Sequence, residues 1–140
     1  MHIPIIRHGF ILILLALISG LFVPTMEIPR LGLSAHTVGI LSGVLLIAVG
    51  SIWQLIVLSD SQRSIMHWSW LYASYVNWLG CLAGAIFGAG KSTPLASAGV
   101  VGTPTAELLV AVLLTSAGVL SFVAVGLSLW GLRRVGISDA

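Results

Sequence analysis

The sequence predicts an all-α integral membrane protein in which four transmembrane helices form one bundle. Its 140 residues are 58% hydrophobic and only 7% charged, and their mean hydropathy is +1.12. About a quarter of the residues of a soluble globular protein are charged, so this chain lacks the polar surface that such a protein needs. Four apolar segments, separated by proline, serine and charged residues, set the number of helices. We expect a single domain over residues 1–140.

The predicted helices cover about residues 8–25, 35–58, 67–88 and 106–132. The first has a short apolar centre, which reaches spanning length when Arg7 and His8 lie at one interface and Pro24 at the other. It resembles a secretory signal, but no small-x-small cleavage site follows, so we interpret it as a retained membrane helix. Pro24 and Pro29 are expected to end it.

The bounds of the remaining helices follow from the lengths of the apolar segments and from the helix-capping and helix-breaking residues between them. The second segment has about 24 residues, enough to cross a hydrocarbon core of ~30 Å at ~1.5 Å per residue. Ser34 is its predicted N-cap, and the segment SDSQRS, residues 59–64, is expected to turn it into the third helix. Pro94 and Pro104 lie in the predicted connection to the fourth.

The basic residues predict the orientation. An even number of spans places both termini on one side, and that side carries Arg7, Arg63, Arg133 and Arg134. The other side carries Arg30 and Lys91. Because basic residues favour cytoplasmic loops, we expect both termini in the cytoplasm and the chain in a bacterial inner membrane.

Small and polar residues recur on one face of three helices, which predicts a compact bundle with a polar interior. They are Gly39, Gly43 and Gly50 on the second helix, Trp70, Ser74, Asn77, Cys81 and Gly84 on the third, and Thr115, Gly118 and Ser121 on the fourth. The single cysteine, Cys81, excludes an internal disulfide, and we expect it to be a small buried filler.

The segment AIFGAGKSTP, residues 85–94, matches a relaxed phosphate-loop pattern. A phosphate loop works at the junction of a buried strand and a helix, with an acidic residue for magnesium. Here the segment follows a membrane helix, and Pro94 prevents a helix from starting at Lys91. We therefore interpret the match as a coincidence. The six basic residues form no patch, which excludes nucleic acid as a partner.

His36, in SAHTVGILSG, is the most informative residue. Ionisable groups at membrane depth usually face the protein interior and are functional candidates, although a histidine wetted by headgroups is the alternative. Gly39 and Gly43 beside it are expected to leave room for a flat group. For His8 and His67, near the opposite interface, we favour the interfacial role.

Other polar side chains lie near the middle of the predicted spans. Asn77 needs a partner, which is another helix or a substrate, because an unbonded amide in hydrocarbon costs several kcal/mol. Tyr72 and Tyr75 flank it, and Ser42 lies on the second helix. The sequence contains no Ser-His-Asp set, carboxylate pair or multi-histidine cluster. Glu107 is expected in the first turn of the fourth helix, where its charge suits the helix dipole.

Four segments, RHGFILILL, SAHTVGILSG, NWLGCLAG and GVVGTPTAELLV, together resemble the hydroxylaminobenzene mutases. These small membrane enzymes convert hydroxylaminobenzene to 2-aminophenol without a cosubstrate. The chain is more distantly similar to styrene oxide isomerase, a trimeric four-helix membrane protein that binds haem b. The resemblance covers nearly the whole chain in order.

The resemblance implies a haem b whose iron is bound by His36, with Gly39 and Gly43 beside it, and a homo-oligomer, by resemblance a trimer. Ser42 and Asn77 fall where the isomerase has a substrate-contacting asparagine and an active-site tyrosine, so both differ in residue type. Tyr72 or Tyr75 is the candidate for the missing phenol. A haem with one histidine ligand leaves its other face open, and its ferric iron is hypothesised to act as a Lewis acid on the hydroxylamino group.

The predicted function is therefore a membrane isomerase that transfers a hydroxyl group within a small aromatic hydroxylamine. One alternative is an epoxide isomerase of the styrene oxide type. Two further alternatives are not enzymes: a haem-binding membrane protein with two axial ligands, and a haem-free structural subunit.

Overall fold

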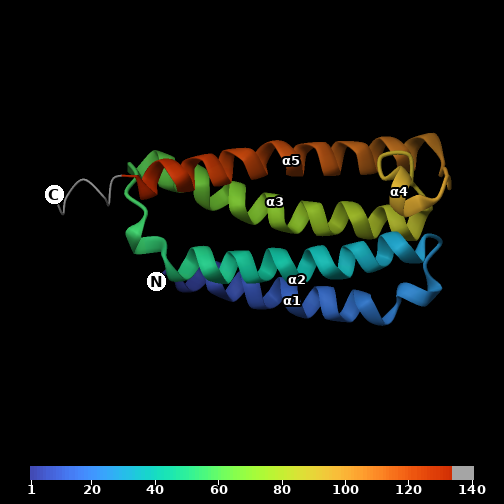
Figure 1. Cartoon of the computed structure of the whole chain (residues 1–140), viewed down its shortest axis with the longest axis horizontal. Coiled ribbons are helices and arrows are strands. Elements are labelled where there is room, and N and C mark those ends of the chain that lie inside the picture. Colours follow the sequence, from blue (N-terminus) through green and yellow to red (C-terminus); the bar gives the residue numbers. More distant parts are fainter. Residues whose placement is uncertain (134–140) are drawn as a thin grey trace.

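The computed structural model describes residues 1–133, and within them every regular element is a helix. Four long helices lie side by side: α1 (Ile3–Leu21), α2 (Pro29–Ser51), α3 (Asp60–Phe87) and α5 (Pro104–Leu132) (Figure 1). Short 3-10 turns, η1 (Val23–Thr25) and η2 (Trp53–Leu55), and the one-turn helix α4 (Pro94–Ser97) lie in the connections. Arg134, counted in the predicted orientation, lies outside the described residues.

The helices pack in the order α1, α2, α3, α5, because α1 packs mainly on α2, α2 also on α3, and α3 on α5. The N-terminus and the end of α5 lie at the same end of the bundle, and α4 lies at the opposite end (Figure 1). Three helices, α1, α2 and α5, are long and apolar enough to cross a membrane. The chain is therefore a helical membrane protein.

The first three helices begin before the predicted residues, and the first two also end earlier than predicted. Helix α2 begins at Pro29, five residues before the predicted N-cap Ser34, whose hydroxyl instead donates to the carbonyl of Arg30 inside the helix. Proline suits the first turn of a helix, because backbone N–H groups there have no acceptor within the helix and proline has no N–H to leave unpaired. Pro29 therefore starts α2 instead of ending α1, which ends at Leu21.

Helix α2 ends at Ser51, so residues up to Leu58 form η2 and an extended connection instead of the predicted helix end. Helix α3 starts at Asp60, inside the segment predicted to be a turn. The reason is a capping box: Ser59 accepts from the N–H of Gln62, while the N–H of Ser59 donates to the Gln62 side chain. Similarly, Thr103 caps α5.

The glycines of α2 allow it to pack very closely on α1, as predicted. A methyl group on Gly43 would lie 2.6 Å from the carbonyl oxygen of Gly9, and one on Gly50 would lie 2.7 Å from Ile6. Such contacts have no room for a side chain, so the backbones themselves meet. Close approach of this kind is the main way membrane helices gain packing energy.

The predicted interior face of α5 is wrong. Thr115 is exposed, and a methyl group on Gly118 would meet nothing within 4 Å. Beyond Glu107 in the first turn, the buried residues of α5 recur instead at seven-residue intervals: Val110, Ala117, Ala124 and Gly131. Because α5 packs mainly on α3, a single narrow stripe is enough to form its contact.

Glu107 lies in the first turn of α5, as predicted, and also anchors the preceding loop. Its buried carboxylate accepts hydrogen bonds from the backbone N–H groups of Lys91, at 3.0 Å, and Gly102, at 2.8 Å. A phosphate loop needs such amides free for phosphate. Here a carboxylate already occupies the Lys91 amide, which agrees with excluding nucleotide binding.

We expect Gly43→Ala to destabilise the protein by about 1–3 kcal/mol, because the added methyl group meets backbone that cannot move aside. Thermal unfolding in detergent measures the change. The matched control is Gly126→Ala on α5, where the methyl group meets nothing within 4 Å. Equal stability of the two variants would show that close packing at Gly43 contributes little.

Replacing Glu107 with alanine removes two charge-assisted hydrogen bonds, each worth about 1.5–3 kcal/mol. We expect the loop over residues 88–103 to loosen and to be cleaved faster by an added protease, as followed by mass spectrometry. Glu27→Ala is the control, since its exposed carboxylate forms no hydrogen bond among the described residues. Unchanged cleavage in Glu107→Ala would contradict the anchoring role.

Candidate functional site

His36 lies on α2, where its half-buried imidazole packs against α1 over Gly20. Its Nδ1 atom is 2.8 Å from the carbonyl oxygen of Ala16. A methyl group on Gly20 would collide with the ring, so this glycine allows the imidazole to reach the α1 backbone. The contact holds the ring at a fixed place between the two helices.

The hydrogen bond to Ala16 sets the tautomer of His36. A carbonyl oxygen only accepts, so Nδ1 must carry the proton, and Nε2 of the neutral ring keeps its lone pair. Histidines that bind metals typically have this arrangement, in which the other ring nitrogen donates to a carbonyl or carboxylate. His36 therefore has the chemistry of a metal ligand.

The Ala16 carbonyl oxygen accepts a second hydrogen bond besides that of His36. The buried hydroxyl of Ser19 also donates to it, at 2.9 Å, and the indole Nε1–H of Trp78 donates to the Ser19 oxygen at 3.5 Å. A chain of hydrogen bonds thus connects α3 to α1 and α1 to His36 on α2. It is the main polar link near His36.

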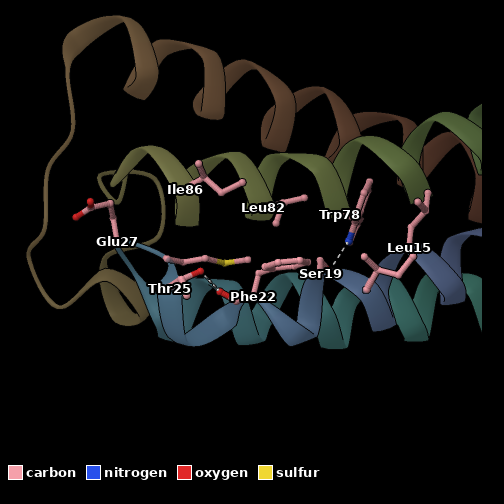
Figure 2. Close-up of a pocket in the computed structure, with 10 residues that line it drawn as sticks. Leu15, Ser19, Phe22, Thr25, Glu27, Trp78, Leu82 and Ile86 are labelled. Atoms are coloured by element: carbon pink, nitrogen blue, oxygen red, sulfur yellow. Dashed lines mark hydrogen bonds between the residues drawn. The ribbon is translucent and has the colours of Figure 1, made fainter.

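A cavity of about 440 Å³ lies beside this chain, between α1, the η1 turn and α3. Figure 2 shows Trp78 projecting from α3 toward Ser19 at its inner wall, while the carboxylate of Glu27 points away from it. The remaining lining is mostly apolar: Leu15, Ile18, Phe22, Met26, Leu82 and Ile86. Its volume falls within the ~300–1,000 Å³ of typical ligand pockets.

Gly39 and Gly43 face α1. A methyl group on Gly39 would lie 2.6 Å from the Ala16 side chain and 2.7 Å from Trp78, and one on Gly43 would meet Ile13 and Gly9. The room predicted here for a flat group is therefore filled by the chain itself. Contact of the two glycines with a cofactor stays a prediction.

Tyr75 pairs with His8. The ring nitrogen Nδ1 of His8 lies 3.1 Å from the Tyr75 hydroxyl, which also donates to the His8 carbonyl at 3.3 Å. His8 and Ala16 are separated by about 12 Å along α1 at ~1.5 Å per residue. The phenol of Tyr75 therefore lies well away from the carbonyl that holds His36.

The other predicted site residues do not join His36 either. Tyr72 is exposed, and its hydroxyl lies 3.1 Å from that of Ser116 on α5. Asn77 and Ser42 are half-buried, and within residues 1–133 neither side chain forms a hydrogen bond. No hydrogen bond among the described residues connects any two of these predicted residues. Asn77 therefore finds no interhelical partner in this part of the chain.

His67 lies at the opposite end of the bundle, where its ring contacts His2 and Trp53 at centroid distances of 5.2 and 6.0 Å. Within the described residues, no group of three or more His, Cys, Asp or Glu side chains is placed to hold a metal ion. Cys81 is buried, as predicted.

Ser19 and Trp78 were not among the predicted site residues. Each carries a weak signal in the sequence. Ser19 is the only hydroxyl residue in α1, and Trp78 follows Asn77 in the NWLG segment. Only the packing of three helices shows that the two side chains meet.

These features define a small helical membrane protein with a fixed histidine beside a ligand-sized apolar cavity. The chain belongs to the styrene oxide isomerase family, whose model matches residues 3–133. It is 38% identical to hydroxylaminobenzene mutase HabB of Ectopseudomonas oleovorans over 130 residues, which cover 92% of this chain and 79% of that protein. It is 39% identical to hydroxylaminobenzene mutase HabA of the same organism over 109 residues, 77% of this chain and 81% of that protein.

No solved structure matches the chain. Membership of this family, together with the mutase relatives, identifies the protein as an isomerase.

The tautomer of His36 can be tested directly. We expect ¹⁵N NMR of histidine-labelled protein at neutral pH to show a protonated Nδ1 and an unprotonated Nε2 for His36, because the Ala16 carbonyl accepts from Nδ1. The signal is assigned by its loss in His36→Gln. An unprotonated Nδ1 would contradict the assigned hydrogen bond.

Proposed function

We propose that the protein converts hydroxylaminobenzene to 2-aminophenol by intramolecular hydroxyl transfer, with haem b held by His36. The observation that carries the proposal is the fixed imidazole, whose Nδ1–H donates to Ala16 and leaves Nε2 free to bind a metal. The mutase relatives, at 38% and 39% identity, support the choice of substrate.

What fits a haem is the chemistry of its single protein ligand, whereas the space beside Gly39 and Gly43 is filled by α1 and Trp78. His36 supplies the imidazole, and the Ala16 carbonyl orients it through a hydrogen bond, as backbone carbonyls often do for metal-binding histidines. When bound, the iron would supply Lewis acidity toward the hydroxylamino group. The small residue Gly20 is needed because it lets the ring lie on α1.

The reaction needs no cosubstrate, because substrate and product contain the same atoms. The N–O bond breaks, a C–O bond forms at the ortho carbon, that carbon loses its proton, and the nitrogen gains one. Asn77 and Ser42, which have unused hydrogen-bonding groups, are proposed to hold the nitrogen and the moving oxygen. Tyr72 or Tyr75 is proposed to supply a phenol to the same task, although within one chain their hydroxyls contact Ser116 and His8 instead of His36.

Exclusion of water is the second contribution of the chain. Bulk water would trap an electron-deficient ring at the wrong carbon, so the reaction benefits from an apolar enclosure. The surfaces of α1 and α3 near the site are built mainly from leucine, isoleucine and phenylalanine side chains.

We propose that α3 also crosses the bilayer, which makes four spans with both termini in the cytoplasm. Its 28 residues extend for about 42 Å at ~1.5 Å per residue, long enough to span. It is less apolar than the others because it carries Ser69, Ser74 and Trp70, which are buried inside the bundle. The Trp70 indole N–H, for example, donates to Ser128 on α5.

An assembly of identical chains, a trimer by resemblance, is part of the proposal. Asn77 has no partner within residues 1–133, and α5 exposes 84% of Phe122. A neighbouring chain at these surfaces would complete their packing.

Epoxide isomerisation is the second candidate, because the matching family is that of styrene oxide isomerase. Turnover of styrene oxide and of hydroxylaminobenzene by the same preparation distinguishes the two functions.

The test compares absorption and turnover of detergent-purified wild-type protein and His36→Gly. We expect the wild type to show a Soret band and to form 2-aminophenol. We expect the variant to lose both and to recover part of each with added imidazole, which replaces the missing ligand. His67→Ala, at the other end of the bundle, should keep both.

Activity without a Soret band would remove haem from the proposal. A Soret band with turnover of styrene oxide alone would replace the mutase function with the epoxide isomerase function. Retention of haem and activity in His36→Gly would overturn the role of His36.

A further inference from the structure

Within residues 1–133, α1 and α3 both pack on α2 and hardly on each other, which leaves a cavity between them. Its outer part is lined by Ile18, Phe22 and Ile86, each about half exposed on the apolar outer surface of the bundle. A molecule dissolved in the hydrocarbon of a bilayer can therefore enter it from the side. At about 440 Å³ it exceeds the ~150 Å³ of an apolar cavity that is known to take up benzene.

Its inner wall is polar at one place. There the Trp78 indole donates to Ser19 at 3.5 Å, which is a long hydrogen bond, and Ser19 as a residue is 7% exposed. The indole N–H is thus directed into the cavity with a weak partner (Figure 2). A ligand oxygen or nitrogen placed closer would make a better bond with it.

We propose that this cavity binds one small neutral aromatic molecule, with its ring among the apolar side chains and its single polar substituent at Trp78 and Ser19. The two residues act as specificity determinants for an aromatic amine or hydroxylamine. This inference rests on the proposed function for naming the hydroxylaminoarene as the natural ligand.

Charge and shape favour this occupant over others. No basic side chain lines the cavity, so an anionic ligand would find no counter-ion, and the carboxylate of Glu27 points away. A lipid acyl chain would fill the apolar part but has no polar atom for the inner wall. A substituted benzene uses both parts.

The cavity is linked to the proposed catalytic histidine by hydrogen bonds, although His36 itself is not among the residues that line it. Ser19 and His36 donate to the same Ala16 carbonyl, so the polar wall is separated from the imidazole by a single backbone group. A ligand that bonds to Ser19 therefore touches the same hydrogen-bonded chain that holds the imidazole of His36.

Binding of 4-fluoroaniline, followed by ¹⁹F NMR of the protein in nanodiscs, tests the inference without any reaction. We expect Ile18→Trp, which fills the cavity from α1, to weaken binding at least tenfold. Leu14→Trp is the matched control, since Leu14 is exposed one turn away and does not line the cavity. Leu82→Trp fills the same cavity from α3 and replaces the first variant if that one does not fold.

The polar wall is tested by Trp78→Phe, which keeps a ring but removes the N–H. We expect it to weaken binding of 4-fluoroaniline about fivefold, the effect of one ordinary hydrogen bond, and to leave 4-fluorotoluene unchanged. Trp68→Phe is the control, because Trp68 is exposed and lies outside this cavity. Unchanged affinity in both filling variants, or equal losses for the two probes in Trp78→Phe, would overturn the inference.

Turnover of hydroxylaminobenzene by the same samples separates the two proposals. Activity in the wild type together with unchanged probe binding in the filling variants overturns the cavity assignment and leaves the mutase function standing. Probe binding with the expected pattern, but no turnover, supports the cavity and overturns the mutase function.

Discussion

The close approach of α1 and α2 is the constraint on which the rest of the structure depends. Glycines at the contact let the two backbones meet, and the Ala16 carbonyl thereby comes within 2.8 Å of the His36 ring. A wider spacing would separate the imidazole from its acceptor and leave its proton unpaired in an apolar surrounding. Helix packing and the chemistry of the histidine are therefore consequences of the same small residues.

The second principle is the satisfaction of polar groups by hydrogen bonds from α3 to other helices. Trp78 reaches Ser19, Trp70 reaches Ser128, and Tyr75 reaches His8. Each bond uses one aromatic side chain of α3, long enough to reach α1 or α5. In an apolar medium an unpaired donor costs several kcal/mol, so these contacts select one arrangement of α3 against its neighbours.

Much of the fold could be predicted from hydropathy, because a long apolar segment in a chain with few charges has only one common structure. The glycine face of α2 was also predicted, since three small residues recur on one side of that helix. The start of α2 was misplaced because Pro29 was interpreted as a stop, although proline is equally suited to a first helical turn. The face of α5 was wrong because its small residues do not mark its contact with α3. The partners of His36 could not be predicted, because Ala16 contributes only its backbone, which leaves no trace in the sequence.

The order of packing along the chain also bears on how the protein is made. The two helices that contact each other most, α1 and α2, are adjacent in sequence and joined by a short turn, and so can pair before the rest is synthesised. Helix α3, which carries serines and tryptophans, is synthesised next and can pack on α2 at once. Its contact with α5 can form only after α5 has been synthesised. The order of the helices in the chain therefore matches an order of assembly. Helix α3, the most polar of the four, has partners on both sides only after α5 has been added.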